Sequence, residues 1–289
     1  MDRESQEPGA HNLALEPSAS PGRMDEQQTP LHLAGVGLLA PGFASWAEAE
    51  SVLTGLAPYR DRGMPPLERL RLSQNEARRF SLSMRIALEV ADEALARTSI
   101  SRRNLACVFA CSGGNAESLH KILQALAENG ASPSQFAQMG HHAAAGGWSI
   151  VNGSLAPTIS LGSWDGSFAA GLLEADCQAR AEQRAVLLVA HDVPPPPAFR
   201  AARPVTSAFA VAFLLAASPA PAPAGRLRLR VARSGGESRM SIPALEALRV
   251  NNPAARALPL LRLIARREGG RVLLPYHDSL QLNVRYTPC

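Results

Sequence analysis

The most informative stretch of this sequence runs from Pro157 to Ser167 and reads PTISLGSWDGS. Its first part, 157–162, is predicted to form a strand, and an apolar helix over about 168–180 follows. A sharp turn from a strand into a helix exposes a side chain beside the helix N-terminus, where backbone N–H groups can stabilise a developing negative charge. Because Ser163 stands at such a turn, it is the first candidate for a functional residue.

Strands and helices alternate on both sides of this turn. The helix over 73–97 has the clearest pattern, because a capping box of Ser73 and Glu76 precedes apolar residues spaced three and four apart. Such alternation predicts an α/β fold with a mostly parallel central sheet covered by helices. The other predicted strands are 31–37, 105–111, 185–190, 206–217, 227–231 and 271–274, with extended chain after Asp278; the other predicted helices are 45–55, one that ends at Gly130, 134–151 and 253–267.

Composition changes divide the chain into four parts. Residues 1–29 carry Gln, Glu, Pro, Ser and Gly without an apolar period and are expected to form a disordered tail, within which Met24 is an alternative start. Residues 30–217 are expected to form the main domain, and the Pro/Ala stretch 218–226 is expected to be a linker. Residues 227–289 are expected to be a small strand-helix-strand extension that packs on the same domain.

Composition also excludes several classes of protein. Of the 289 residues, 46% are hydrophobic and 19% are charged, so the chain can bury a large core. Its longest apolar run, 208–217, is about half of the roughly 20 residues that a membrane span needs, and no signal peptide is recognisable, so we expect a cytoplasmic protein without a membrane span. The net charge of +4 comes with only 5% aromatic residues, too few for base stacking, so nucleic acid is not an expected partner.

Cysteine and histidine spacing indicates no metal site and no cofactor. The four cysteines have no CxxC spacing and are expected to be reduced and mostly buried. His141 and His142 are adjacent, so on a helix they point about 100° apart and are unsuited to one metal ion. We interpret them as surface or interface residues.

A serine nucleophile at Ser163 is an alternative that the residues leave open. The hydrolase elbow has glycines two residues before and two residues after its serine, whereas Leu161 and Asp165 occupy these positions here. The hydrolase motif therefore fails, and the plainer interpretation of Ser163 is a small residue in a tight turn. A serine acyltransferase or hydrolase would need a base, for which His191 and His142 are the candidates.

The order of the segments resembles the β-ketoacyl synthase family. The stretch 33–42, LAGVGLLAPG, is similar to the family's opening strand and turn, and 141–160 resembles the approach to its active-site cysteine. The resemblance covers roughly 31–217, so the expected fold is half of a thiolase-like fold, with the small C-terminal extension. The segments that are similar to those of the family, in order, are 33–42, 73–97, 108–114, 141–151, 157–160, 169–175 and 186–192.

Within the family, the chain resembles the short proteins that carry essentially this half alone. Members occur in aryl polyene and related pigment gene clusters of Gram-negative bacteria, where one acts as a chain-length-factor-like partner of a complete ketosynthase. The stretch 252–261, NPAARALPLL, is similar to the end of that subgroup. The resemblance implies a non-condensing partner of a full-length β-ketoacyl synthase in acyl carrier protein-dependent fatty acid or polyketide biosynthesis, with a homodimer as the fallback.

Two departures from the family pattern bear on catalysis. Ser163 stands where the family has its nucleophilic cysteine, and Trp164-Asp165-Gly166 replaces the usual small residues. The histidines and the lysine of condensing enzymes come from a second half without a counterpart in this sequence, and Lys121 and His277 lie outside any matching motif. The resemblance therefore implies no catalytic residue in this chain.

Two sets of residues are predicted to carry the partner function. The resemblance places the far end of an acyl tunnel in this protein, and aromatic side chains beside a strand edge are typical of a buried interface. A module that binds carrier protein without a ketosynthase stays an alternative. The tunnel and turn candidates are Ser112, Gly113, Gly114, Ser163, Trp164 and Asp165, and the dimer-interface candidates are Trp148, Ile150, Ile159, Trp164 and Phe168.

Overall fold

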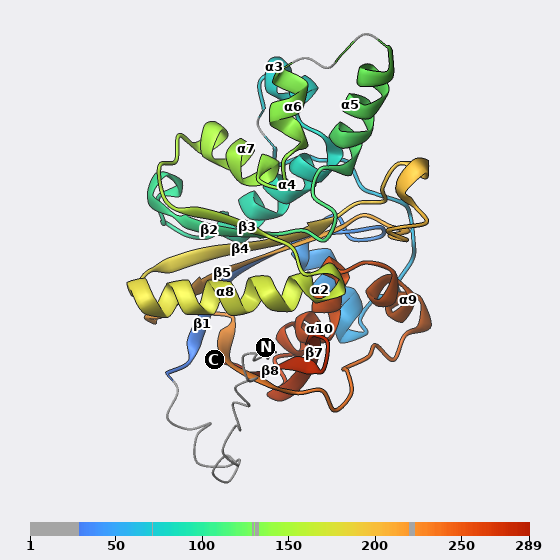
Figure 1. The fold of residues 1–289 in the computed structure, drawn as a ribbon. Helices are drawn as coiled ribbons and strands as arrows, with labels where there is room; N and C mark the ends of the chain where they lie inside the picture. The colour runs from blue at the N-terminus through green and yellow to red at the C-terminus, as the bar shows by residue number, and fades with distance from the viewer. Residues whose placement is uncertain (1–28, 71, 129, 131–132, 220–222) are drawn as a thin grey trace, which may run out of the picture.

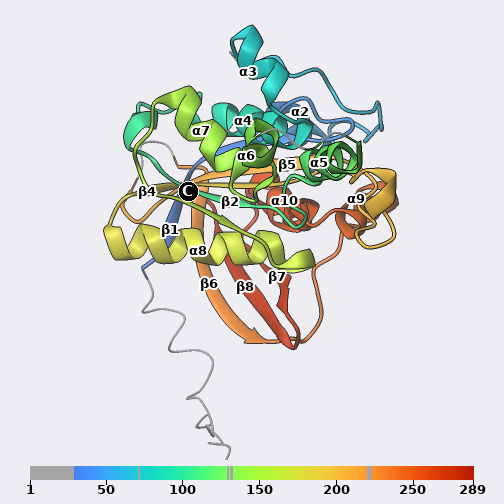
Figure 2. The same cartoon turned by 45° about the horizontal axis from the view of Figure 1, so that its top comes forward.

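One eight-stranded sheet runs through the described residues (Figures 1 and 2). The computed structural model describes residues 29–289 except 71, 129, 131–132 and 220–222, so the expected tail up to residue 28, Met24 included, and the middle of the expected linker lie outside the described residues. The strands are β1 (Leu31–Leu39), β2 (Ala106–Ala110), β3 (Thr158–Leu161), β4 (Ala185–Asp192), β5 (Phe209–Ala216), β6 (Gly225–Arg233), β7 (Gly270–His277) and β8 (Leu280–Thr287). Their order across the sheet is β3-β2-β4-β5-β1-β6-β8-β7.

Strand direction differs from the expected mostly parallel sheet. β2 pairs in parallel with β3 and with β4, whereas the five other pairings, β4–β5, β5–β1, β1–β6, β6–β8 and β8–β7, are antiparallel. The prediction was wrong because it inferred parallel strands from the alternation of strands with helices, whereas only a short 3-10 turn over 197–199 lies between β4 and β5. β5 is antiparallel to both of its neighbours while being buried along almost its whole length.

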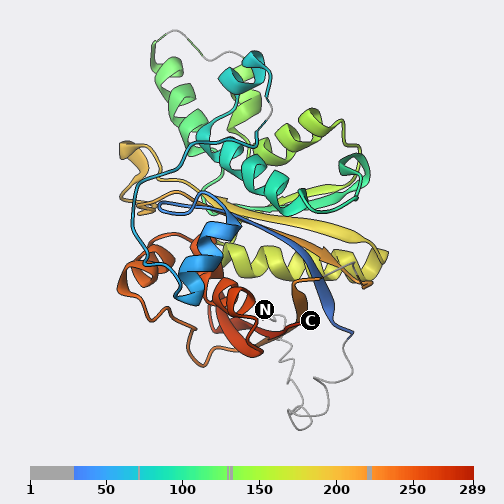
Figure 3. The same ribbon diagram turned by 180° about the vertical axis from the view of Figure 1, so that it is seen from behind.

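Helices cover both faces of the central strands (Figures 1 and 3). The helices are α2 (Trp46–Thr54), α3 (Gln74–Arg79), α4 (Leu82–Leu95), α5 (Ala116–Glu128), α6 (Pro133–Met139), α7 (Ala143–Asn152), α8 (Ser167–Glu182), α9 (Pro243–Asn251) and α10 (Leu258–Arg266). On one face α4 packs on β1, β5 and β4 with α7 beside it, and on the other face α8 packs on β2 and β4 while α2 lies against α10. Each face has its own apolar core, with Phe109 and Trp148 in one and Phe168 and Phe213 in the other.

Helix α4 lies very close to strand β1. A Cβ atom at Gly37 would collide with the carbonyl oxygen of Val90, so only glycine permits this approach of helix and strand. Glu93 of the same helix accepts hydrogen bonds from the N–H of Leu38 at 2.9 Å and of Trp46 at 2.8 Å. The helix is thereby fixed to the end of β1 and to the start of α2.

The predicted helix over 73–97 is divided in the structure. The capping box of Ser73 and Glu76 is present, but it opens only the short α3. Ser81 then caps α4 by accepting a hydrogen bond from the N–H of Met84. The apolar spacing continues across this break, which is why the periodicity alone predicted one helix.

The predicted helices over 134–151 and 253–267 are also shorter in the structure. The first forms α6 and α7, which are separated where His141 Nε2 lies 2.8 Å from the carbonyl oxygen of Cys111. The second is a short 3-10 turn over 254–257 followed by α10. Helix α9 was not predicted, although Pro243 in its first turn and the apolar residues Leu245 and Leu248 are sequence signals for it.

The chain after residue 222 continues the sheet beyond β1. β6 pairs with β1, for example Leu227 with Leu31, and the β8–β7 hairpin follows outward (Figure 2). Helices α9 and α10 lie between β6 and β7 in the chain. The limits of the domain and its extension stay a prediction. In the part of the chain that the structure describes, no helix has the length and apolar content to cross a bilayer.

Candidate functional site

The segments that follow the three parallel strands β2, β3 and β4 lie together at the carboxyl ends of these strands. β2 leads into Cys111 and Ser112, β3 leads into Ser163, and β4 ends at Asp192. Because parallel strands end on the same side of a sheet, these residues share one region, and in α/β folds this is where ligands are usually bound. The structure therefore brings Ser112 and Ser163, two of the predicted tunnel and turn candidates, into a single candidate site.

Asp192 is a buried carboxylate that anchors the turn after β2. Its Oδ1 accepts hydrogen bonds from the N–H of Ser112 at 2.9 Å, from the Ser112 hydroxyl at 2.6 Å and from Cys111 Sγ at 3.6 Å. Its Oδ2 is buried and has no hydrogen-bond partner among the described residues. Burial raises the pKa of Asp192 to about 6, although the hydrogen bonds from Ser112 act in the opposite direction.

Arg203 connects the turn after β2 with the turn after β3. Its Nε donates a hydrogen bond to Ser112 Oγ at 2.9 Å, and its Nη2 donates one to Asp165 Oδ1 at 2.9 Å. Its guanidinium also lies over the ring of Trp164, with 4.9 Å from Cζ to the ring centroid. Trp164 has a φ of 45°, which is unfavourable for a bulky residue, so these contacts hold a strained turn in place.

No pattern in the sequence singles out Arg203. The residue lies in the loop between β4 and β5, which has no hydrophobic period. The available signal was indirect: Asp192 at the end of an apolar strand needs a polar partner if it is buried. That argument predicts that a partner exists without showing which of the many arginines it is.

A second group of ion pairs continues from Asp165 to the C-terminal helices. Arg256 Nη2 lies 3.8 Å from Asp165 Oδ2, and its Nη1 lies 2.9 Å from Glu237 Oε2. Glu237 also pairs at 3.0 Å with the buried Arg249, which in turn pairs with Glu246 at 2.7 Å. Hydrogen bonds from Arg249 lower the pKa of Glu246 to about 2. Charged side chains thus link the turn after β3 to α9.

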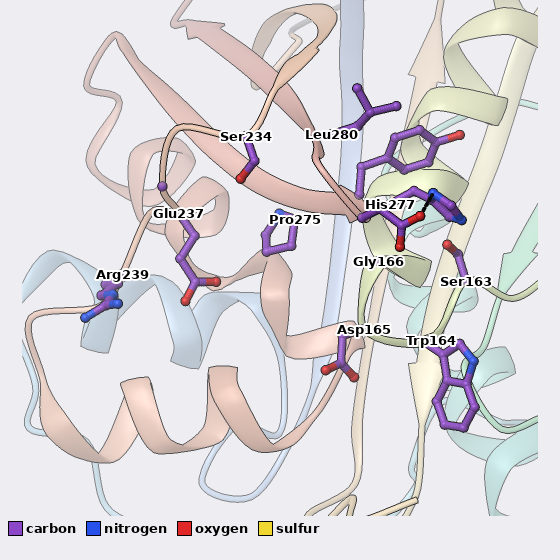
Figure 4. A pocket seen from close by; sticks show the side chains of 13 residues that line it. Ser163, Trp164, Asp165, Gly166, Ser234, Glu237, Arg239, Pro275, His277 and Leu280 are labelled. Atoms are coloured by element: carbon purple, nitrogen blue, oxygen red, sulfur yellow. Dashed lines mark ion pairs between the residues drawn. The ribbon is translucent and has the colours of Figure 1, made fainter.

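An open pocket of about 510 Å³ lies between this turn and the β7–β8 hairpin (Figure 4). Gly166 lies so close to the hairpin that a Cβ atom there would collide with the carbonyl oxygen of Tyr276. Ser163 and His277 both line the pocket, and His277 Nδ1 is 3.3 Å from Asp278 Oδ2. His277 lies outside any matching sequence motif, yet the structure places it in the same pocket as Ser163.

The two histidines considered as bases for Ser163 make other contacts. His191 is buried and its Nδ1 lies 3.0 Å from Ser83 Oγ, and burial lowers its pKa to about 3. His142 Nδ1 lies 2.9 Å from Ser160 Oγ in an exposed position. Within the described residues neither histidine has a hydrogen bond to Ser163, so the geometry does not support either as its general base.

Ser163 has the surroundings of a structural turn residue. Its N–H donates a hydrogen bond to Ser167 Oγ at 3.0 Å, and the Ser167 hydroxyl donates one to the carbonyl oxygen of Trp164 at 2.6 Å. An acyl-transfer site needs N–H groups that are free to bind an oxyanion. The N–H of Ser163 is already hydrogen-bonded to Ser167 Oγ. The nearby Cys111 offers no replacement nucleophile, because burial raises the pKa of its thiol.

Three of the five predicted interface residues are exposed. The exposed fraction is 72% for Ile150, 38% for Ile159 and 64% for Trp164. Trp148 and Phe168 are fully buried in the two cores of this chain, so they are not available to a partner and this part of the prediction was wrong. Ile159 lies on β3, which is the outermost strand at its end of the sheet.

The mixed sheet with helices on both faces is a thiolase-like α/β fold of the ketosynthase type. The model of the β-ketoacyl synthase N-terminal domain family matches residues 44–253. The chain therefore belongs to the β-ketoacyl synthase family, as the segment order predicted. No protein with a curated description matches the sequence.

Solved structures share this fold at low sequence identity. A ketosynthase in complex with its chain length factor from Xenorhabdus doucetiae matches with 24% identity and a TM-score of 0.69, over 89% of this chain and 100% of that one. A type II polyketide synthase acyl carrier protein in complex with its ketosynthase, bound to the hexaketide, matches with 10% identity and a TM-score of 0.70, over 91% and 100%. The ishigamide ketosynthase/chain length factor matches with 13% identity and a TM-score of 0.66, over 90% and 99%. These likenesses establish the thiolase-like fold.

Proposed function

We propose that this chain is a non-condensing, chain-length-factor-like partner of a complete ketosynthase in acyl carrier protein-dependent fatty acid or polyketide biosynthesis of the aryl polyene type. The observation that carries the proposal is the outer edge of β3, which has no neighbouring strand in the described structure and leads directly into the turn at Ser163. An open strand edge is a template for pairing with another chain. Two of the solved structures that share the fold are named as containing chain length factors.

The surroundings of Ser163 support a role without condensation. Transfer of an acyl group between thioesters needs a thiolate or an activated hydroxyl. Ser163 has no hydrogen-bonded base among the described residues, and the Cys111 thiol is buried. The hydrogen bond from the Ser163 N–H to Ser167 Oγ and the packing of Arg203 on Trp164 fix the turn. A rigid turn beside a partner's active site is suited to limiting the length of an acyl chain.

The proposed partner is a full-length β-ketoacyl synthase, joined as a heterodimer, with acyl carrier protein docking on the assembled pair. A homodimer through the same strand edge is the fallback. The exposed side chains Ile150, Ile159 and Trp164 would be covered in either assembly. All four cysteines of the chain are free, which suits a reducing compartment, so we place the assembly in the cytoplasm.

The proposal is tested by co-expression with the ketosynthase encoded nearest to this chain. Size-exclusion chromatography with light scattering measures the mass of this chain alone and of the co-purified material. A 1:1 complex with the ketosynthase supports the proposal. A monomer in both experiments contradicts it, and a stable monomer that binds acyl carrier protein would favour the carrier-binding module instead.

A serine hydrolase or acyltransferase is the second candidate. The observation in its favour is that Ser163, His277 and Asp278 line one pocket, and that His277 is paired with Asp278. Against it, His277 and Asp278 are largely exposed, so solvent weakens their pairing. Incubation with acyl carrier protein thioesters followed by intact-mass measurement separates this candidate from the partner function.

A further inference from the structure

The turn after β3 contains an unusual backbone conformation. Four non-glycine residues have a positive φ among the described residues. Gln183 and Arg267 follow the last residues of helices, and Asp278 lies between β7 and β8, which are ordinary places for this conformation. Trp164, with a φ of 45°, instead lies at the start of a helical segment. For a bulky residue this conformation is unfavourable, and such strain is concentrated at functional sites.

Burial of the indole does not compensate for this strain. The Trp164 side chain is 64% exposed, so its hydrophobic surface gains little from folding. Arg203 covers one face of the ring at 4.9 Å, and a cation–π contact at an exposed site contributes modestly. Stability alone therefore does not account for a tryptophan at this position.

The glycines of the turn are in register with Trp164. A nucleophile elbow has glycines two residues before and two residues after its reactive residue, and Gly162 and Gly166 stand at these distances from Trp164. A Cβ atom at Gly162 would come within 2.8 Å of the carbonyl oxygen of Cys111, and one at Gly166 would collide with the carbonyl oxygen of Tyr276. Both glycines are therefore required by close packing, as they are in an elbow.

Ser163 lies one residue before the strained position. Its φ is −145°, outside the left-handed region, and the residue is half-buried. The Ser163 side chain and the indole of Trp164 point in different directions from the turn (Figure 4). In an elbow the reactive side chain belongs to the strained residue and is exposed. The backbone thus favours Trp164 as the central residue, one position after the serine that the family resemblance places there.

We propose that this turn is a nucleophile elbow whose reactive position is occupied by Trp164, and that the indole prevents an acyl group from being loaded there. In an elbow the N–H of the residue after the nucleophile binds the oxyanion, and here that residue is Asp165. A thioester carbonyl would have to come within about 3 Å of this N–H, next to the Cα atom that carries the indole. This inference concerns the chain alone and holds whether or not a ketosynthase binds it.

The test places a thiol at each of the two candidate positions in the full chain. Cys177 and Cys289 are exposed and are first replaced by serine, whereas the two other cysteines are buried and are kept. Trp164→Cys and Ser163→Cys are then made in this background. Leu155→Cys is the matched control, because Leu155 is 94% exposed and precedes β3 instead of following it.

Two rates are measured on each variant by intact mass in the same mildly alkaline buffer: alkylation by iodoacetamide and acylation by the hexanoyl thioester of N-acetylcysteamine. In the acylation the cysteine thiolate attacks the carbonyl carbon, a new C–S bond forms, and the N-acetylcysteamine thiolate leaves and takes up a proton. Both rates depend on the thiolate fraction and its access, but only acylation passes through an oxyanion. The ratio of the acylation rate to the alkylation rate therefore measures oxyanion stabilisation.

We expect this ratio to be at least tenfold higher in Trp164→Cys than in Ser163→Cys and Leu155→Cys, because a single oxyanion donor contributes about 10²- to 10³-fold in rate. Equal ratios in the three variants, or the highest ratio in Ser163→Cys, would overturn the proposal. Copurification with the ketosynthase is a separate measurement, so a failure of the partner function would be recognised independently of these rates.

A second comparison decides the position of the elbow if a cysteine variant does not unfold cooperatively. Trp164→Gly and Trp164→Ala both lose the indole and differ in backbone freedom. Because a φ of 45° suits glycine, Trp164→Gly should unfold at a higher urea concentration than Trp164→Ala. At Ser163, where φ is −145°, the order should be reversed. If Trp164→Ala is as stable as Trp164→Gly, the strained position is not at residue 164 and the proposal fails.

Discussion

Arg203, in the loop after β4, forms an ion pair of 2.9 Å with Asp165, which lies in the turn after β3. The same guanidinium also donates a hydrogen bond to Ser112. The two contacts differ in their surroundings, because the Asp165 side chain is 56% exposed whereas that of Arg203 is 15% exposed. An ion pair with an exposed partner contributes little in water. The Ser112 bond and the packing on Trp164 are therefore expected to contribute most.

Replacing Arg203 by Met should lower the free energy of unfolding by about 1 to 3 kcal/mol, because it removes a charged hydrogen bond and leaves the Ser112 hydroxyl with one partner fewer. Urea denaturation followed by tryptophan fluorescence measures this change. Asp165→Asn, which removes only the exposed side of the ion pair, should cost less than about 1 kcal/mol. If Asp165→Asn is as costly as Arg203→Met, the ion pair is the main link between the turns.

The buried carboxyl group of Asp192 should make stability depend on pH. Its pKa is about 6 in the folded protein and about 3.9 in an unfolded chain. Between these values the folded protein holds a proton that the unfolded chain has released, so the free energy of unfolding falls as the pH rises from about 4 to about 6. Two pKa units correspond to a loss on the order of 3 kcal/mol, which persists above pH 6.

Asp192→Asn removes this titration while keeping an oxygen that accepts the Ser112 hydrogen bonds. We expect the variant to gain stability relative to the wild type as the pH rises through this range, with the difference levelling off above about pH 6. Urea titrations at several pH values between about 4 and 8 measure both profiles. Parallel profiles of the two proteins would show that Asp192 is ionised with an ordinary pKa in the folded state.

The hydroxyl of Ser81 marks the start of α4 and the break after α3. Its side chain accepts a hydrogen bond from the N–H of Met84, as that of Ser45 does from Glu48 at the start of α2. Ser81→Ala should therefore lower the free energy of unfolding by about 1 kcal/mol, and Ser45→Ala by a similar amount. Thermal or urea denaturation measures both. A neutral Ser81→Ala beside a costly Ser45→Ala would mean that the helix runs unbroken through residue 81.

The sequence predicted where strands and helices lie far better than it predicted their long-range relations. The strand and helix on either side of Ser163 were correct because their patterns are local. Arg203 was missed because its contacts with Ser112 and Asp165 join segments far apart in the chain.

The error at Trp148 has a different cause. Trp148 and Ile150 lie two residues apart on α7, and such residues point to nearly opposite sides of a helix. Only one of them could therefore face a partner. The helical period already contained this information: Trp148 faces the core and Ile150 faces outward.

Ser163 should not be acylated. Serine is a weak nucleophile without an activating base, and its own N–H is already bound to Ser167. Incubation with acyl carrier protein thioesters followed by intact-mass measurement should show no adduct, in the wild type as in Ser163→Ala. A stoichiometric adduct that disappears in both Ser163→Ala and His277→Ala would establish the hydrolase or acyltransferase candidate, since both residues line the same pocket.

Ile159 should be essential for association with the ketosynthase. Its side chain is exposed on β3, the strand whose outer edge is proposed to pair with the partner. Ile159→Asp would place a carboxylate in a surface that becomes buried and apolar on association, and an unpaired buried charge costs several kcal/mol. We therefore expect at least a hundredfold weaker association, seen as loss of copurification and as a shift to the mass of the free chain in light scattering.

The matched control for this prediction is Leu56→Asp, which places the same charge at an exposed apolar residue just after α2, away from β3. Leu56→Asp should copurify with the ketosynthase as the wild type does, and circular dichroism should show that both variants are folded. If Ile159→Asp is folded and still forms the complex with wild-type affinity, β3 is not the contact strand. If both substitutions abolish the complex equally, the loss reflects added charge and not the strand edge, and the pairing proposal fails.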